Sequence, residues 1–233
     1  MRRQRNLAHR GASGYEYENS RAAFRRAIAL EANGVELDVH ATRDGGFVVY
    51  HDAVISGAGP IALLSLDEAR RCRLPNGEAV PTLAEILALM GPHEVWVEVK
   101  AMPASYDDRL LQLLADGPDP DRYAVHSFDH RIIRRLGQRR PDLRRGVLLS
   151  AYVLDPVAIL DGAAASTLWQ EQTMVDAQLV ATVHDAGYEL IAWTVNDPGD
   201  ISRLVQLGVD GLCGNFPDRI RVELGTQPYN EDR

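Results

Sequence analysis

The sequence predicts an α/β fold, a TIM-type (β/α)8 barrel that is irregular between its second and third strands. Short apolar runs rich in Val, Ile and Leu alternate with stretches of helical periodicity along the chain. Parallel neighbouring strands need crossover connections, so this order predicts a mainly parallel sheet. The length of 233 residues is close to the roughly 250 residues common in such barrels. An open doubly wound sheet is the alternative, but the sequence has no GxGxxG or Walker-type glycine loop.

Nine segments have the composition of strands, one more than an eight-stranded barrel uses. We expect the segment 166–170 to lie outside the barrel, because its strand pattern is the weakest. The predicted strands are 6–10, 35–39, 47–51, 95–100, 123–127, 146–149, 166–170, 189–195 and 210–215. The predicted helices are 20–32, 65–73, 82–90, 106–115, 130–139, 174–186 and 197–207.

The connection between the second and third predicted strands breaks the pattern. It has seven residues, HATRDGG, which is too short for a crossover helix. Asp44-Gly45-Gly46 suits a hairpin turn, which would make the third strand antiparallel to the second. An extended return would keep it parallel. We expect the parallel arrangement, because it brings the end of this strand to the same edge as the other strand ends.

Composition and charge limit what the protein binds. Residues 1–233 show no linker or low-complexity segment, so we predict a single barrel domain with a polar tail from about Gly225. The formal net charge of −8 argues against nucleic acid and anionic membranes as partners. No apolar run reaches the roughly 18 residues of an integral membrane segment, and we expect a cytoplasmic protein. The sequence makes no prediction of the oligomeric state.

Ionisable residues stand at the ends of four successive predicted strands, where parallel α/β folds place their active sites. Residues two apart on a strand point to the same face, so the paired side chains of 36 and 38, and of 98 and 100, project together. Lys100 is also the one lysine among 25 basic residues, and it lies in a strand. The four groups are His9 with Arg10, Glu36 with Asp38, His51 with Asp52, and Glu98 with Lys100.

Three of these side chains are carboxylates that would repel one another if they converged. A hard divalent cation offsets that repulsion, and Ca²⁺ and Mg²⁺ prefer oxygen ligands. We therefore predict that Glu36, Asp38 and Glu98 bind one divalent cation, Ca²⁺ or Mg²⁺. Zinc is less expected, because it favours His or Cys ligands. Taken singly, each pair is as typical of a solvated face or a buried ion pair; their shared position at the strand ends favours a site.

The order of short motifs resembles the glycerophosphodiester phosphodiesterase family. The similarity extends over about residues 6 to 220. The matching segments are HRG at 9–11, EN at 18–19, AF at 23–24, ELDV at 36–39, T-R-DG at 42–45, VVYHD at 48–52, PTLAE at 81–85, EVK at 98–100, SF at 127–128, WTVN at 193–196 and D-G-x-x-x-N-x-P-D at 210–218.

This resemblance implies a TIM-type barrel that hydrolyses small-molecule glycerophosphodiesters to glycerol 3-phosphate and an alcohol. It implies His9 and His51 as the acid/base pair, without deciding which is which, and a divalent metal on Glu36, Asp38 and Glu98. Arg10 and Lys100 would hold phosphoryl oxygens. Trp193 would face the mouth and stack on the glycerol or the alcohol, with a core position as its alternative.

Two residues depart from the family pattern, and two other functions remain open. Tyr17 stands where the family has proline, and Gly214 stands where it usually has threonine. The alternatives are a lysophospholipase D-type phosphodiesterase and a non-catalytic module that binds phosphate esters; the intact histidine pair argues against the latter. The remaining histidines, His40, His93, His126, His130 and His184, are expected to be structural or exposed.

Overall fold

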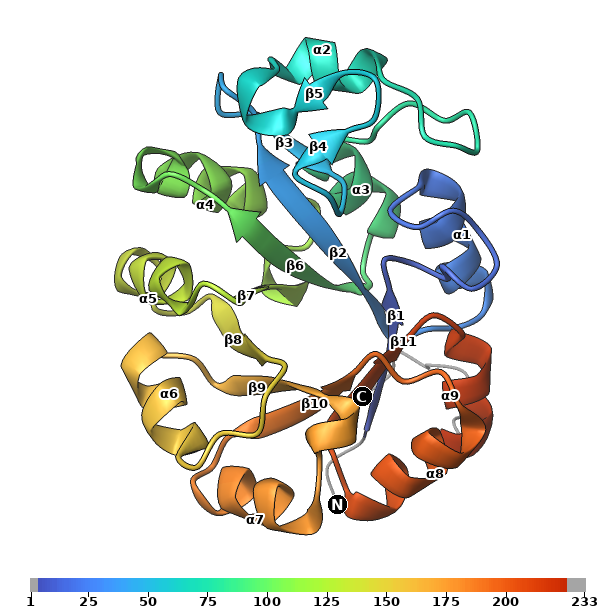
Figure 1. Cartoon of the computed structure of the whole chain (residues 1–233), viewed down its shortest axis with the longest axis vertical. Helices are drawn as coiled ribbons and strands as arrows, with labels where there is room; N and C mark the ends of the chain where they lie inside the picture. Colours follow the sequence, from blue (N-terminus) through green and yellow to red (C-terminus); the bar gives the residue numbers. More distant parts are fainter. Residues whose placement is uncertain (1–3, 226–233) are drawn as a thin grey trace.

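The computed structural model describes residues 4–225 and shows a closed parallel barrel surrounded by helices (Figure 1). Eight strands follow one another around the barrel, and the pairing of β1 with β2 closes it. The predicted fold class is therefore confirmed. The barrel strands are β1 (Arg5–His9), β2 (Gly34–Ala41), β6 (Glu94–Ala101), β7 (Tyr123–Ser127), β8 (Arg144–Leu149), β9 (Thr167–Glu171), β10 (Glu189–Trp193) and β11 (Gly211–Gly214).

Helices follow the strands and cover the outer face of the barrel (Figure 1). Side-chain oxygens that cap first-turn N–H groups fix where several of them begin; Ser65 and Thr82 each form a reciprocal capping box with a glutamate. The helices are α1 (Arg21–Ala29), α2 (Leu66–Arg71), α3 (Leu83–Met90), α4 (Asp107–Ala115), α5 (His130–Arg139), α6 (Pro156–Ala163), α7 (Ala177–Asp185), α8 (Pro198–Leu207) and α9 (Pro217–Leu224).

The prediction of a parallel third strand was wrong. β3 (Phe47–Val49) pairs antiparallel with β2, with Val39 opposite Val49. A tight turn reverses the chain, because the Thr42 N–H donates to the Gly46 carbonyl (2.9 Å) and Gly45 adopts φ +77°. The hairpin extends beyond the end of the barrel and returns to the level of Asp38, whose carbonyl accepts from the Tyr50 N–H (3.0 Å). An antiparallel return thus still brings the following residues back to the barrel rim.

The expectation that 166–170 lies outside the barrel was also wrong. β9 is a barrel strand that pairs parallel with both β8 and β10. The sequence analysis missed α6 and α9 as well as the small β4 (Val54–Ile55) and β5 (Gly59–Pro60) hairpin. β9 contains Trp169, which points into the barrel, and the buried polar residue Gln170. Its sequence therefore lacks the run of Val, Ile and Leu that is typical of a barrel strand. The predicted tail beyond Gly225 lies outside the described residues.

Two apolar layers stabilise the barrel. The outer layer lies between the sheet and the helices, whereas a smaller cluster fills the interior and includes Leu7, Trp96, Trp169, Ile191 and Cys213. Burial of these side chains is the main favourable contribution to folding. The interior cluster fills the barrel below the rim. The cavity that holds most of the predicted site residues lies above this cluster, where the strands end.

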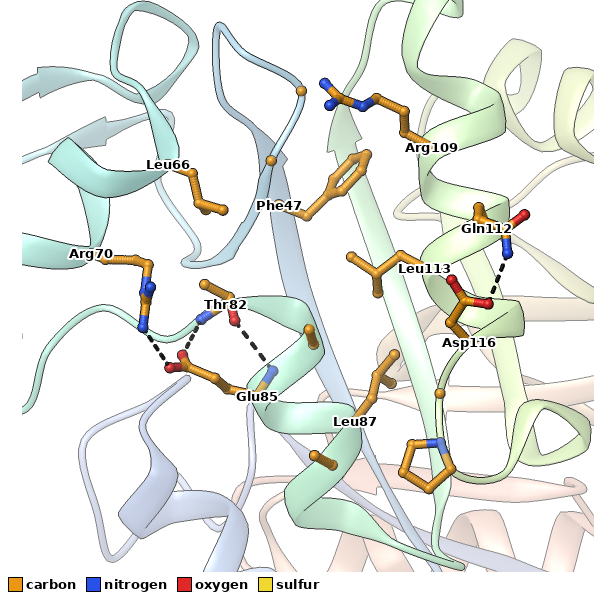
Figure 2. A pocket seen from close by; sticks show the side chains of 16 residues that line it. Phe47, Leu66, Arg70, Thr82, Glu85, Leu87, Arg109, Gln112, Leu113 and Asp116 are labelled. Atoms are coloured by element: carbon orange, nitrogen blue, oxygen red, sulfur yellow. Dashed lines mark hydrogen bonds and ion pairs between the residues drawn. The ribbon is translucent and has the colours of Figure 1, made fainter.

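A groove of about 840 Å³ lies outside the barrel, between α3 and α4 (Figure 2). Phe47, Leu87 and Leu113 face it, and the ion pair of Arg70 with Glu85 (3.1 Å) borders it. Of the eight residues that the sequence predicts for the site, none lines this groove. Among the described helices, we find none with the length and apolar composition that a membrane crossing needs.

Candidate active site

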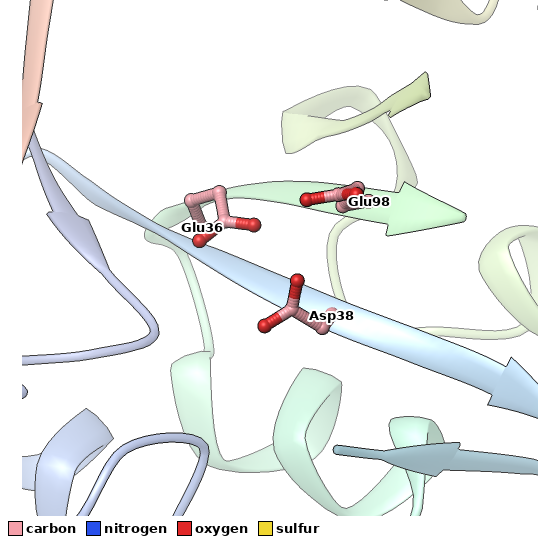
Figure 3. Close-up of side chains that lie close together, drawn as sticks. All are labelled: Glu36, Asp38 and Glu98. Carbon is pink, nitrogen blue, oxygen red and sulfur yellow. The ribbon is translucent and has the colours of Figure 1, made fainter. Parts of the chain in front are cut away.

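Three carboxylates meet at the rim of the barrel, as the sequence predicts. Glu36 and Asp38 project from β2, and Glu98 projects from β6 (Figure 3). The register of these parallel strands places Asp38 beside Glu98. One oxygen of each carboxylate lies within 4.8 Å of the others, and all three side chains are buried. Three oxygen donors at this separation are suited to hold one hard divalent cation.

The electrostatics of this cluster differ between its members. Burial, together with the neighbouring charge of Asp38, raises the pKa of Glu36 to about 7 and that of Glu98 to about 8. Burial also acts to raise the pKa of Asp38, but the charges of Lys100 and Arg10 hold it at about 2. The nearby cationic side chains therefore do not offset the burial of the two glutamates, and a bound cation would add the positive charge that does.

The two cations of the site lie directly on these carboxylates. The ammonium of Lys100 lies 2.9 Å from Asp38 Oδ1 and 2.7 Å from Glu98 Oε1. The guanidinium Nε of Arg10 lies 3.1 Å from Asp38 Oδ2, and its Nη1 donates to Glu18 (2.8 Å). Both side chains are part-exposed at the rim, so each can also reach a bound anion.

The conformation of the loop after β1 requires a glycine at position 11, directly after Arg10. Arg10 adopts φ +54° and Gly11 φ +78°, a left-handed turn that glycine accommodates. A Cβ on Gly11 would lie 2.7 Å from the backbone of Ala23 at the start of α1. The same loop carries Asn19, whose buried amide donates to Asp38 Oδ2 (2.8 Å). The turn thus fixes both the guanidinium and one carboxylate.

His9 has a neutral partner. Its Nδ1 lies 2.8 Å from Oδ1 of Asn215, at the end of β11, and an amide oxygen can only accept a hydrogen bond. Nδ1 therefore carries the proton, and Nε2 has a free lone pair 3.9 Å from Glu36 Oε2. Burial lowers the pKa of His9. The arrangement holds a neutral imidazole that can accept a proton at Nε2.

His51 has a charged partner. Its Nδ1 donates to the carboxylate of Asp52 (2.8 Å), and a carboxylate stabilises positive charge on the ring. The backbone of His51 is held in place by His40, whose Nε2 donates to the His51 carbonyl (2.9 Å). His40 is thus structural, as the sequence analysis expects. The two predicted catalytic histidines therefore occupy chemically different environments at the same rim.

A cavity of about 250 Å³ connects these groups. It brings together seven of the eight predicted site residues, and Asp38 lies directly beneath through its ion pairs with Arg10 and Lys100. The sequence analysis expected His126 to be structural or exposed, but its ring is buried in this cavity, 3.8 Å from Glu36 Oε1. The cavity is lined by His9, Arg10, Glu36, His51, Glu98, Lys100, His126, Phe128, Leu148, Trp169 and Trp193.

The sequence analysis gave no role to the residues that position the predicted site residues. Glu18, Asn19, Asp52 and Asn215 each contact a predicted site residue through a hydrogen bond. Each stands next to or inside a short motif of polar residues, which was the available signal. The partner of Asn215 could not be read from the sequence, because Asn215 is 206 positions from His9.

Gly214, at the end of β11, lies so close to the backbone of Val195 that a side chain has no room there. A Cβ there would lie 2.1 Å from the carbonyl oxygen of Val195. We expect Gly214→Thr to lower the free energy of unfolding by about 2 kcal/mol or more, measured by thermal unfolding. Gly162→Ala in α6, where a Cβ would meet nothing within 4 Å, is the control and should be neutral or stabilising. Equal stability of the two variants would contradict this explanation.

Comparison with known proteins agrees with this geometry. The model of the Glycerophosphoryl diester phosphodiesterase family matches residues 9–219. A glycerophosphodiester phosphodiesterase from Caldanaerobacter subterraneus subsp. tengcongensis is 30% identical over 230 residues, covering 92% of this chain and 95% of the relative.

Solved structures show the same architecture. An Oleispira antarctica phosphodiesterase in complex with the product sn-glycerol-3-phosphate has a TM-score of 0.87 at 25% identity, covering 94% of this chain and 96% of that one. A glycerophosphodiester phosphodiesterase from Parabacteroides distasonis shares the fold with a TM-score of 0.87 at 24% identity, covering 96% and 98% of the two chains.

Proposed function

The chain belongs to the glycerophosphoryl diester phosphodiesterase family, and from this premise we propose that it hydrolyses glycerophosphodiesters to glycerol 3-phosphate and an alcohol with one divalent cation and a histidine pair. The observation that carries this proposal is the convergence of three buried carboxylates, two imidazoles and two cationic side chains around one cavity. The product named with the Oleispira antarctica structure, sn-glycerol-3-phosphate, is consistent with this substrate class.

The cation site fits the residues that surround it. Glu36, Asp38 and Glu98 offer oxygen atoms within 4.8 Å of one another. Burial raises the pKa values of the two glutamates despite the cationic side chains nearby, which supports a site for an added cation. Oxygen donors alone favour Mg²⁺ or Ca²⁺. When bound, such a cation stabilises negative charge on the phosphoryl oxygens and orients the substrate.

The partners of the two histidines support a division of roles between them. His9 Nε2 accepts the proton from the attacking oxygen, because the amide of Asn215 keeps the other ring nitrogen protonated. His51 donates a proton to the alcohol oxygen as its bond to phosphorus breaks, and the Asp52 carboxylate, which accepts from its Nδ1, orients the ring for that transfer. His9 gains one proton and His51 loses one, so the pair returns to its starting state once His9 passes a proton to solvent and His51 takes one from it.

Arg10 and Lys100 complete the charge balance. A phosphodiester carries one negative charge, and more charge develops on its equatorial oxygens during attack. Both cations lie at the rim within 3.1 Å of Asp38, so they are held before the substrate arrives. Donors fixed in advance stabilise such developing charge without reorganising. Trp193, half-buried in the lining of the same cavity, borders the space for the organic part of the substrate.

Turnover of glycerophosphocholine tests the proposal. We expect sn-glycerol 3-phosphate and choline as products in the presence of Mg²⁺ or Ca²⁺, and loss of turnover when EDTA removes the cation. Both products should be quantified, because glycerol and phosphocholine would mean that the other ester bond is cleaved. Release that continues unchanged in EDTA would contradict the cation site. Tight binding without any release would favour a binding module.

A further inference from the structure

The cavity has two chemically different halves. Charged side chains come from β1, β2, β6 and the segment after β3, whereas β7 to β10 contribute aromatic and apolar ones. Phe128, just after β7, packs edge-to-face on Trp193 at the end of β10, with ring centroids 5.6 Å apart and planes at 80°. β7 and β10 are separated by two strands, so this pair reaches across the apolar half and borders its opening.

The apolar half offers few hydrogen-bonding atoms to a ligand. The ring nitrogens of His126 and the indole nitrogens of Trp169 and Trp193 have no hydrogen-bond partner among the described residues, but they are buried beneath the lining and not exposed to the open cavity. Leu148 and Phe128 contribute no polar side-chain atoms. A group that depends on hydrogen bonds with water would lose them here without replacement, and each loss costs binding energy.

The proposed reaction, on which this inference rests, leaves one position for each half of the substrate. The glycerol hydroxyls need polar partners, and the charged half provides them in Arg10, Lys100 and the carboxylates. On this placement the phosphorus would lie between the halves, in the cavity that both histidines line. The departing alcohol is then directed towards Phe128 and Trp193.

We propose that this aromatic half is a subsite that selects a quaternary ammonium alcohol, of the choline type, as the leaving group. A trimethylammonium group has no N–H, so it leaves no donor without a partner where exposed polar atoms are absent. It is attracted to the faces of aromatic rings, and two rings at a steep angle suit it. A primary ammonium or a polyol would lose hydrogen bonds in the same place.

Three glycerophosphodiesters test this subsite: the choline ester, the ethanolamine ester and the 3,3-dimethylbutyl ester. The last has the shape of choline without its charge, so it separates attraction to the cation from simple apolar burial. For the native chain we expect kcat/KM to be about fivefold or more higher for the choline ester than for either of the others. The measurement is made at fixed Mg²⁺ concentration and pH.

A substitution then assigns the preference to the ring. Phe128 is 48% exposed, so Phe128→Leu removes the aromatic face with little expected effect on folding. We expect the choline preference over the 3,3-dimethylbutyl ester to fall to about twofold or less, because one of two ring faces is lost. Tyr152→Leu is the matched control: Tyr152 is a part-exposed ring that does not line the cavity, and its loss should leave the preference unchanged.

Two results would overturn the subsite. Equal kcat/KM for the choline and 3,3-dimethylbutyl esters would show an apolar pocket without selection for charge. An unchanged preference in Phe128→Leu would show that the ring does not select. In both cases the esters are still cleaved, so the proposed function stands. Cleavage of none of the three esters would overturn the subsite and the proposed function together.

Discussion

His51→Ala is expected to slow hydrolysis of glycerophosphocholine by about a thousandfold, while slowing a p-nitrophenyl glycerophosphate far less. General acid catalysis contributes roughly 10² to 10⁴, and it matters most when the leaving alkoxide is strongly basic. The p-nitrophenolate anion leaves without a proton. A loss that depends on the leaving group is therefore the signature of the proton donor, and steady-state kcat with the two substrates measures it.

His9→Ala is the complementary variant. We expect a loss of about a thousandfold with both substrates, because activation of the attacking oxygen does not depend on the leaving group. Circular dichroism and thermal unfolding should confirm that both variants fold. If His9→Ala instead spares the p-nitrophenyl ester and His51→Ala does not, the roles inferred from Asn215 and Asp52 are reversed. Near-native turnover in either variant would reject its histidine as a catalytic residue.

Glu98→Gln is expected to weaken cation binding by about a hundredfold or more and yet to stabilise the cation-free protein. The pKa of Glu98 is raised to about 8 in the folded protein from an ordinary value of 4.5. Its contribution to stability is therefore complete below pH 4.5 and is lost as the pH rises to about 8. Glutamine does not ionise, and Lys100 keeps Asp38 as a partner. At pH 8 in EDTA the gain should be on the order of 1–3 kcal/mol.

Asp38→Asn is the control with the opposite sign. The pKa of Asp38 is held at about 2 by Lys100 and Arg10 against the effect of burial. Its ionised form stabilises the fold above the ordinary value of 3.8, and this contribution is lost as the pH falls towards 2. We therefore expect Asp38→Asn to lower the melting temperature at pH 8, although it also weakens cation binding.

Isothermal titration with Mg²⁺ and thermal unfolding in EDTA measure the two effects separately. A gain of 1–3 kcal/mol corresponds to roughly 3–10 °C for a chain of this size. If Glu98→Gln and Asp38→Asn lower the melting temperature equally in EDTA, the buried Glu98 carboxylate does not destabilise the cation-free protein. If both bind Mg²⁺ as tightly as the native chain, the three carboxylates are not its ligands.

The predictions that succeeded depend on local patterns. Period two on β2 and β6 places Glu36 with Asp38, and Glu98 with Lys100, on common faces, and the structure brings them together. The repeated order of strand and helix implies parallel strands with their ends at one edge. These inferences need no knowledge of distant contacts, because each follows from the geometry of a single element.

The predictions that failed depend on competition between segments. Phe47–Val49 and Thr167–Glu171 are both short strands, and the sequence does not show which of them pairs on both sides within the barrel. Closure decides it: β9 fits between β8 and β10, whereas β3 pairs as a hairpin beyond the end of β2. That hairpin, rather than a parallel strand, carries His51 back to the rim.

The amino-acid order by itself predicted the barrel, which the structure confirms, and the three carboxylates and two histidines that the structure brings to one rim. The tertiary structure decided which histidine has the amide partner and which has the carboxylate, and it placed Phe128 against Trp193. The physical reason is the range of the interactions. Strand periodicity acts over two residues, whereas the tautomer of His9 is set by Asn215 from the opposite end of the chain, brought beside it when β1 pairs with β11.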